Sequence, residues 1–119
     1  TDTVTLTTTI DSSAVIDLGA GKDKLTLADG GNTGTLSNVE SVVGGSGDDD
    51  ITFDAAVSGG TINLGDGSDK LTLANGTNVL TVGNVETVIG GTGTDNVTLT
   101  TTLPGTALID LGDGTDTLI

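Results

Sequence analysis

The protein is a chain of 119 residues in which 17 acidic side chains face only three lysines, giving a formal net charge of −14. Such a charge repels nucleic acid and anionic membranes, so neither is an expected partner. The chain has no Cys or His and no apolar run long enough to span a membrane, which excludes disulfides, thiol catalysis, a Ser-His-Asp site and membrane insertion by a helix. We expect no enzymatic activity.

Similar segments recur along the chain. The sequence IDLGAGKDKLTLA begins at Ile16, INLGDGSDKLTLA begins at Ile62, and IDLGDGTDTLI begins at Ile109. The long repeat is therefore 46–47 residues, with copies at about 16–61 and 62–108 and partial copies at 1–15 and 109–119. Because a fixed period of this length is typical of stacked repeats, we expect residues 1–119 to form one repeat array that belongs to a longer chain.

Strand-like stretches alternate along the chain with loops rich in Gly and Asp. Apolar and polar residues alternate within them, as in Leu25-Thr26-Leu27, which is typical of a strand with one buried face. The expected strands are Val15–Leu18, Lys24–Leu27, Val39–Val43, Ile51–Phe53, Thr61–Leu64, Lys70–Leu73, Val85–Ile89, Val97–Thr100, Leu108–Leu111 and Thr117–Ile119. In Leu36–Val42 and Val82–Val88 the apolar residues fall at every third position instead, which favours a coil with short corners.

Each loop contains a shorter unit: small or Leu, Gly, x, Gly, x, Asp, x, apolar, x. Copies start at Leu18, Gly44, Leu64, Gly90 and Leu111, and Thr1–Thr5 carries the end of a sixth. The copies at Gly44 and Gly90 fit the nonapeptide G-G-x-G-x-D-x-U-x at every fixed position. The sixth position, which we call the motif aspartate, is Asp2, Asp23, Asp49, Asp69, Asp95 and Asp116.

This pattern resembles the RTX, or haemolysin-type, calcium-binding repeat family, and the resemblance extends along the whole chain. One difference is that 11–17 other residues separate successive nonapeptides here, whereas typical arrays of the family run them back to back. The resemblance implies Ca²⁺ ions between the loops of neighbouring turns, with the six motif aspartates as side-chain ligands. It further implies carbonyl ligands at Gly19, Gly21, Gly45, Gly47, Gly65, Gly67, Gly91, Gly93, Gly112 and Gly114, with Asp48, Asp66 and Asp113 as accessory acids.

The spacing of the motif aspartates predicts the architecture. Their intervals are 21, 26, 20, 26 and 21 residues, and each suits one turn of a parallel β-helix. We therefore predict an all-β parallel β-roll of about five turns of 20–26 residues, with two facing parallel sheets. All motif loops would lie along one edge, and variable segments such as Asp29–Gly34 and Asp54–Gly60 along the other. The alternative is 46 residues per turn with two distinct loop edges.

Several functions fit this pattern. We expect a structural calcium-binding segment of a secreted bacterial protein, such as an S-layer, adhesin or filament protein, which by resemblance leaves the cell through type I secretion and folds on Ca²⁺ outside. The alternative is a calcium-dependent secretion or folding module of a larger secreted enzyme or toxin. A third possibility is an ice- or glycan-binding face built on Thr-rich strands, and a fourth is that the Gly-Asp loops only make turns. Expected partners are calcium ions and either further repeats or other copies of the chain.

Overall fold

The computed structural model describes every residue from Thr1 to Ile119 and contains thirteen strands and no helix. The structure therefore contains no helix that is long and apolar enough to span a membrane. The strands are β1 (Thr3–Thr5), β2 (Val15–Asp17), β3 (Lys24–Thr26), β4 (Thr33–Ser37), β5 (Ser41–Ser46), β6 (Asp50–Phe53), β7 (Ser58–Asp66), β8 (Lys70–Thr72), β9 (Val79–Gly83), β10 (Thr87–Thr92), β11 (Asn96–Leu99), β12 (Leu108–Asp113) and β13 (Thr117–Leu118).

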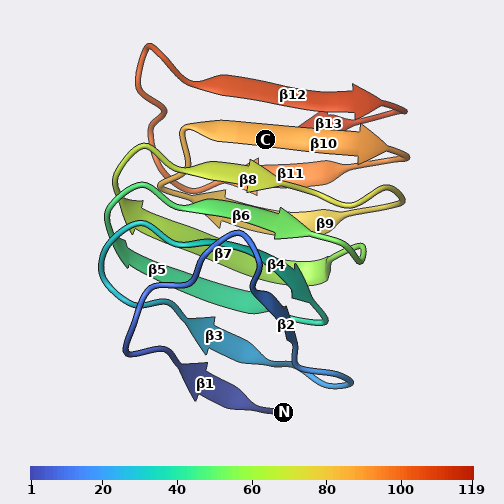
Figure 1. Ribbon diagram of the computed structural model, residues 1–119. Helices are drawn as coiled ribbons and strands as arrows, with labels where there is room; N and C mark the ends of the chain where they lie inside the picture. Colours follow the sequence, from blue (N-terminus) through green and yellow to red (C-terminus); the bar gives the residue numbers. More distant parts are fainter.

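Successive strands alternate between two parallel sheets. The odd-numbered strands form sheet 1, in the order β1-β3-β5-β7-β9-β11-β13, and the even-numbered strands form sheet 2. Each turn of the chain therefore contributes one strand to each sheet, and thirteen strands make about six turns, stacked into the rod seen in Figure 1. The prediction of an all-β solenoid with two facing parallel sheets is confirmed.

The turns are shorter than the spacing of the motif aspartates suggested. In sheet 1 Thr3 pairs with Lys24, Lys24 with Ser41, and Ser41 with Thr61, so these turns contain 21, 17 and 20 residues. The long repeat corresponds to five strands, since β3–β7 recurs as β8–β12. One repeat is therefore two and a half turns, and the alternative of 46 residues per turn is wrong.

The odd number of strands in the repeat places the motif loops on both edges of the rod. We call the corners from sheet 1 to sheet 2 edge 1, on the left in Figure 1, and the corners back to sheet 1 edge 2, on the right. The intervals of 20 and 21 residues contain two strands, whereas those of 26 contain three and cross to the other edge. The prediction of one loop edge is therefore wrong: Asp49 and Asp69 lie on edge 1, and Asp2, Asp23, Asp95 and Asp116 lie on edge 2.

The core between the sheets is aliphatic and arranged in rows. In parallel strands equivalent positions stack on one another, so Leu25, Val42, Ile62 and Val82 follow each other along sheet 1. All four are at most 1% exposed. The single aromatic residue, Phe53, is buried in the same cluster. Each inward row buries Leu, Ile or Val from turn after turn, which is the main apolar contribution to stability.

Two strands, β4 and β9, were not predicted from the sequence, because the period of three runs from each of them across the following corner into the next strand. Its middle position belongs to that tight corner, next to Asn38 and Asn84, which adopt φ of 53° and 51°. These two asparagines lie on opposite edges, and each donates from its Nδ2 to the preceding turn, to Asp17 and Asn63 respectively. The short corners were therefore predicted correctly, but the coil between them is a strand.

Candidate metal centre

Four residues from consecutive turns form a polar ladder on edge 1. Asn32, Asp49, Asp69 and Glu86 each stand immediately before a strand of sheet 2. The backbone N–H groups of the first three donate to the side-chain oxygen of the next residue, each at 2.8 Å: to Asp49 Oδ1, Asp69 Oδ1 and Glu86 Oε2. Each carboxylate therefore folds back onto the preceding turn. We call these residues, and the residues at the equivalent positions on edge 2, the rungs of their ladders.

The same ladder recurs on edge 2 before strands of sheet 1. There the N–H of Asp2 donates to Asp23 and that of Asp23 to Glu40. Further along, the N–H of Asn78 donates to Asp95 and that of Asp95 to Asp116. The order of rungs is Asn, Asp, Asp, Glu, and the long repeat generates it, since Asn78 and Glu86 follow Asn32 and Glu40 by 46 residues. Only the ladder on edge 1 has all four rungs.

Four motif aspartates are almost completely buried and only half satisfied. Asp23, Asp49, Asp69 and Asp95 are each 1% exposed. Their Oδ1 atoms accept the N–H of the preceding rung, but their Oδ2 atoms are buried with no hydrogen-bond partner, and no other buried side-chain nitrogen or oxygen lacks one. An unsatisfied buried polar group costs about 1–3 kcal/mol, and a charged one costs more. These four oxygens therefore lack the donor or positive charge that a buried carboxylate oxygen normally has.

The protonation of the rungs on edge 1 reflects this burial. Burial, joined by the charges of Asp49, Glu86 and Asp48, raises the pKa of Asp69 to about 6, and the N–H of Asp49 offsets only part of the rise. Burial also raises the pKa of Asp49, against the hydrogen bonds from Asn32. Since a buried carboxylate gains a proton more readily than an exposed one, both groups are costly to keep charged at neutral pH without a positive partner.

The predicted accessory acids lie outside the ladder. Asp48 is exposed in a loop of edge 1, Asp66 is exposed at the end of β7 on the same edge, and Asp113 is exposed at the end of β12 on edge 2. The Oδ1 of Asp48 accepts the N–H of Ser68 at 2.8 Å and so ties two turns together. No group of three or more acidic side chains converges with the spacing of a metal site. A cation bound here would therefore be held by rung carboxylates together with backbone carbonyls, and Ca²⁺ accepts both kinds of oxygen.

The motif glycines are required by the stacking of the turns. Gly45 pairs with Gly65, and Gly91 pairs with Gly112, as parts of parallel strands. A Cβ on Gly44 would overlap the carbonyl oxygen of Leu64, and one on Gly65, at φ +98°, would overlap that of Gly45. Backbone lies on backbone at these positions, which only Gly permits. Glycines at these stacked positions are thus explained without a cation, and the evidence for a cation is the unpartnered carboxylate oxygens.

The Asn and Glu rungs lie outside the nonapeptide motif and were not predicted from the sequence. Asn32 is fully buried and its amide is fully used: Oδ1 accepts the N–H of Ile10, and Nδ2 donates to Ala28, Gly30 and Asp49. A usable signal was present, because each type of rung recurs after 46 residues and Asn32 ends a loop, Ala28-Asp29-Gly30-Gly31-Asn32, that resembles the motif. The missing glycine at Ala28 and the Asn in place of Asp kept this loop outside the pattern.

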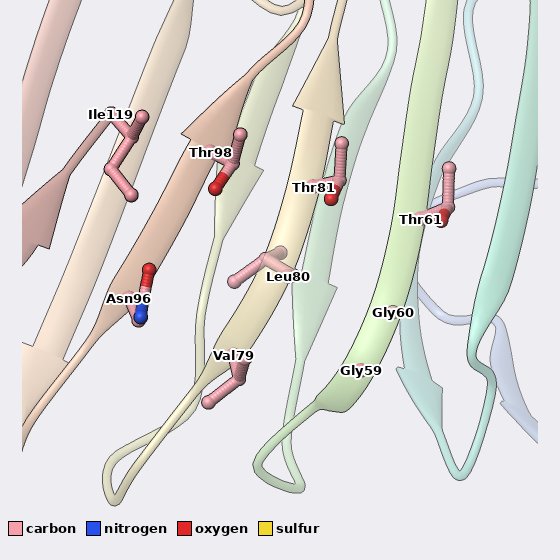
Figure 2. Close-up of a pocket in the computed structure, with 9 residues that line it drawn as sticks. All are labelled: Gly59, Gly60, Thr61, Val79, Leu80, Thr81, Asn96, Thr98 and Ile119. Atoms are coloured by element: carbon pink, nitrogen blue, oxygen red, sulfur yellow. The ribbon is translucent and has the colours of Figure 1, made fainter.

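A shallow groove lies across sheet 1, and none of its lining residues is a rung of a ladder. It has a volume of about 310 Å³ and contains no acidic residue. Thr61, Thr81 and Thr98 form a row across its strands, with Val79 and Ile119 beside them (Figure 2). Hydroxyl and aliphatic groups of this kind offer neither a general base nor an activated nucleophile.

Comparisons of the chain with protein-family models, with curated proteins and with solved structures found no match. Because a solenoid fold by itself does not imply a function, the function has to be argued from the rungs and the loops that present them.

Proposed function

We propose that this chain is a structural, non-enzymatic calcium-binding segment of a secreted bacterial surface protein, which completes its folding when Ca²⁺ binds at the motif aspartates. One observation supports this most strongly. The only buried side-chain oxygens without partners are the Oδ2 atoms of Asp23, Asp49, Asp69 and Asp95, and all four are motif positions. Acids that served only as solvated turn residues would be exposed, whereas these are 1% exposed.

The chemistry of the rungs favours Ca²⁺ over other cations. Ca²⁺ takes six to eight oxygen ligands in flexible geometry, whereas Mg²⁺ keeps its waters and needs a tight octahedron. The chain has no His or Cys, so it lacks the nitrogen and sulfur ligands that zinc and copper prefer. When bound, Ca²⁺ supplies the positive charge that the buried carboxylates lack. The rung Oδ1 atoms keep the turns in register, and the Oδ2 atoms and loop carbonyls are the available ligands.

The charge of the whole chain supports a fold that depends on cations. Seventeen acids face three lysines, and only one ion pair involves a side-chain amine, Lys70 with Asp50 on the outer face of sheet 2. Stacking the turns brings like charges together and opposes folding until cations bind. A chain of this kind is only marginally folded where calcium is scarce and completes its folding where calcium is abundant, which fits export followed by completion of folding outside the cell.

The test is a calcium titration of the chelator-treated chain, followed by far-UV circular dichroism and by the melting temperature. We expect the β signal and the melting temperature to rise with CaCl₂, because cation binding is coupled to folding. MgCl₂ at the same concentration, and NaCl at the same ionic strength, should have much smaller effects. A chain that is fully β without calcium, and whose spectrum and melting temperature calcium leaves unchanged, would contradict the proposal.

A further inference from the structure

We infer that the two loops ending in Asn32 and Asn78 are cation-free counterparts of the motif loops, in which the side-chain amide nitrogen takes the position that a cation takes in the Asp loops. A single Asn→Asp change in either loop then creates a new cation site. The inference rests on the proposed function and concerns residues that the motif does not include.

The Asn loops have the backbone of the Asp loops. In both kinds of loop, the residue two positions before the rung is a glycine with positive φ. The φ angles are 99° at Gly30 and 106° at Gly76 in the Asn loops. They are 106° at Gly47, 150° at Gly67 and 132° at Gly93 in the Asp loops. The rung N–H in both kinds of loop donates to the carboxylate of the next turn, at 2.8 Å from Asn32 and 2.8 Å from Asp49. Asn and Asp therefore present their side chains from equivalent positions.

The surroundings of the Asn amide nitrogen are a set of oxygen atoms. Asn32 Nδ2 lies 2.9 Å from the carbonyl of Ala28, 2.8 Å from that of Gly30, and 2.9 Å from Asp49 Oδ1. Asn78 Nδ2 repeats this arrangement on edge 2 with Ala74, Gly76 and Asp95. Two carbonyls of the same loop and one carboxylate of the next turn thus converge on a positively polarised group.

The Asp loops contain the equivalent oxygens but no donor. For Asp69 the equivalent carbonyls belong to Gly65 and Gly67, and the next rung is Glu86, which accepts the N–H of Asp69 at 2.8 Å. The extra oxygen of Asp69, its Oδ2, replaces the NH₂ group of Asn and has no partner. Oxygen atoms facing one another without a donor form a cation site.

The identity of two successive rungs determines which loops bind a cation. A cation position needs a buried Asp rung followed by an acidic rung, which occurs at Asp23–Glu40, Asp49–Asp69, Asp69–Glu86 and Asp95–Asp116. The step from Asp2 to Asp23 does not qualify, because Asp2 is exposed. These four steps start at the four aspartates with an unpartnered Oδ2. Two lie on each edge of the rod in Figure 1. Glu40 and Glu86 complete the last site of the two ladders that end in Glu, and the Asn rungs begin their ladders without a cation.

The experiment counts calcium ions by isothermal titration calorimetry of the full chain. The wild type should bind four, one for each step named above. Asn32→Asp places an Asp rung before Asp49 and should add one ion. In Asp49→Asn the side-chain amide nitrogen takes the position of the cation in that loop, so this variant should bind one ion fewer. Asp29→Asn is the matched control, since Asn75 occupies the equivalent position in the next repeat, and it should leave the count unchanged.

The outcomes separate the inference from the proposed function. No calcium binding by the wild type would overturn the proposed function. Binding by the wild type with an unchanged count in folded Asn32→Asp would overturn the inference alone. If Asn32→Asp does not fold, the count for Asp49→Asn decides, because an unchanged count there also overturns the inference. Glu86→Gln keeps the oxygen that accepts the N–H of Asp69 but loses the charge, and should weaken one site by about tenfold or more.

Discussion

At the scale of single residues, the two oxygens of a motif aspartate have different roles. Oδ1 accepts the N–H of the preceding rung, for example from Asp49 to Asp69 at 2.8 Å, and fixes the register of two turns. Oδ2 has no partner inside the protein. An Asn at the same position keeps the first role and loses the second, as Asn32 and Asn78 show. The shape of the corner therefore does not require an aspartate.

The raised pKa of Asp69 predicts how the metal-free chain responds to pH. Burial raises this pKa to about 6, against about 3.9 in an unfolded chain. Between pH 4 and 6 the folded state holds more protons than the unfolded state, so the free energy of unfolding should fall as the pH rises through this range. The measurement is urea unfolding in the presence of a chelator, compared with Asp69→Asn.

The comparison with Asp69→Asn isolates this one carboxyl from the other acids of the chain. We expect the stability of the wild type relative to Asp69→Asn to decrease from pH 4 to pH 6 and then to level off, because Asp69 is then ionised in both states. With saturating calcium the decrease should disappear, since the cation replaces the proton. A relative stability that increases over the same range without calcium would contradict the assigned burial of Asp69.

At the scale of strands and corners, the glycines determine how closely successive turns approach. Gly44 lies in β5, directly over the backbone of Leu64 in β7, and a Cβ there would overlap the Leu64 carbonyl oxygen. The carbonyl belongs to the backbone of a paired strand and cannot turn aside as a side chain would. The corner must therefore open before any larger residue fits.

We predict that Gly44→Ala destabilises the chain even in saturating calcium. Overpacking of this kind costs about 1–3 kcal/mol, and more where backbone must move. Gly105→Ala is the control, because Gly105 lies in the loop between β11 and β12 with no atom within 4 Å of its Cβ position. Thermal melts of both variants test this. Equal melting temperatures for Gly44→Ala and the wild type would show that the turns are less tightly stacked than described.

At the scale of the whole molecule, the sequence was enough for the class of fold and for the core. Alternating residues such as Leu25-Thr26-Leu27 predicted strands, and the regular repeat predicted stacked turns. The sequence was not enough for the arrangement of the loops, because the distance between motif aspartates does not say how many strands lie between them. Gly34, the second residue of β4, obscured the strand that carries the chain across to the other edge, since Gly is depleted from strands.

The candidate site, like the fold, could be predicted from the sequence only in part. The motif pointed to six aspartates, and the structure buries four of them with an unpartnered oxygen, Asp23, Asp49, Asp69 and Asp95. It leaves the other two, Asp2 and Asp116, exposed or half-buried. The motif did not point to Asn32 or Glu86, whose roles depend on contacts with a turn 17 residues away. A contact between turns has no local signature in the chain, so only the register of the sheets reveals which loops are neighbours.

The most direct test of the central claim is a crystal structure grown in calcium, with the ions located by anomalous scattering. We predict anomalous peaks within about 2.6 Å of carboxylate oxygens at Asp49 and Asp69 on edge 1 and at Asp23 and Asp95 on edge 2, and none beside Asn32 or Asn78. An ordered structure in millimolar calcium with no peak at any motif aspartate would contradict the claim.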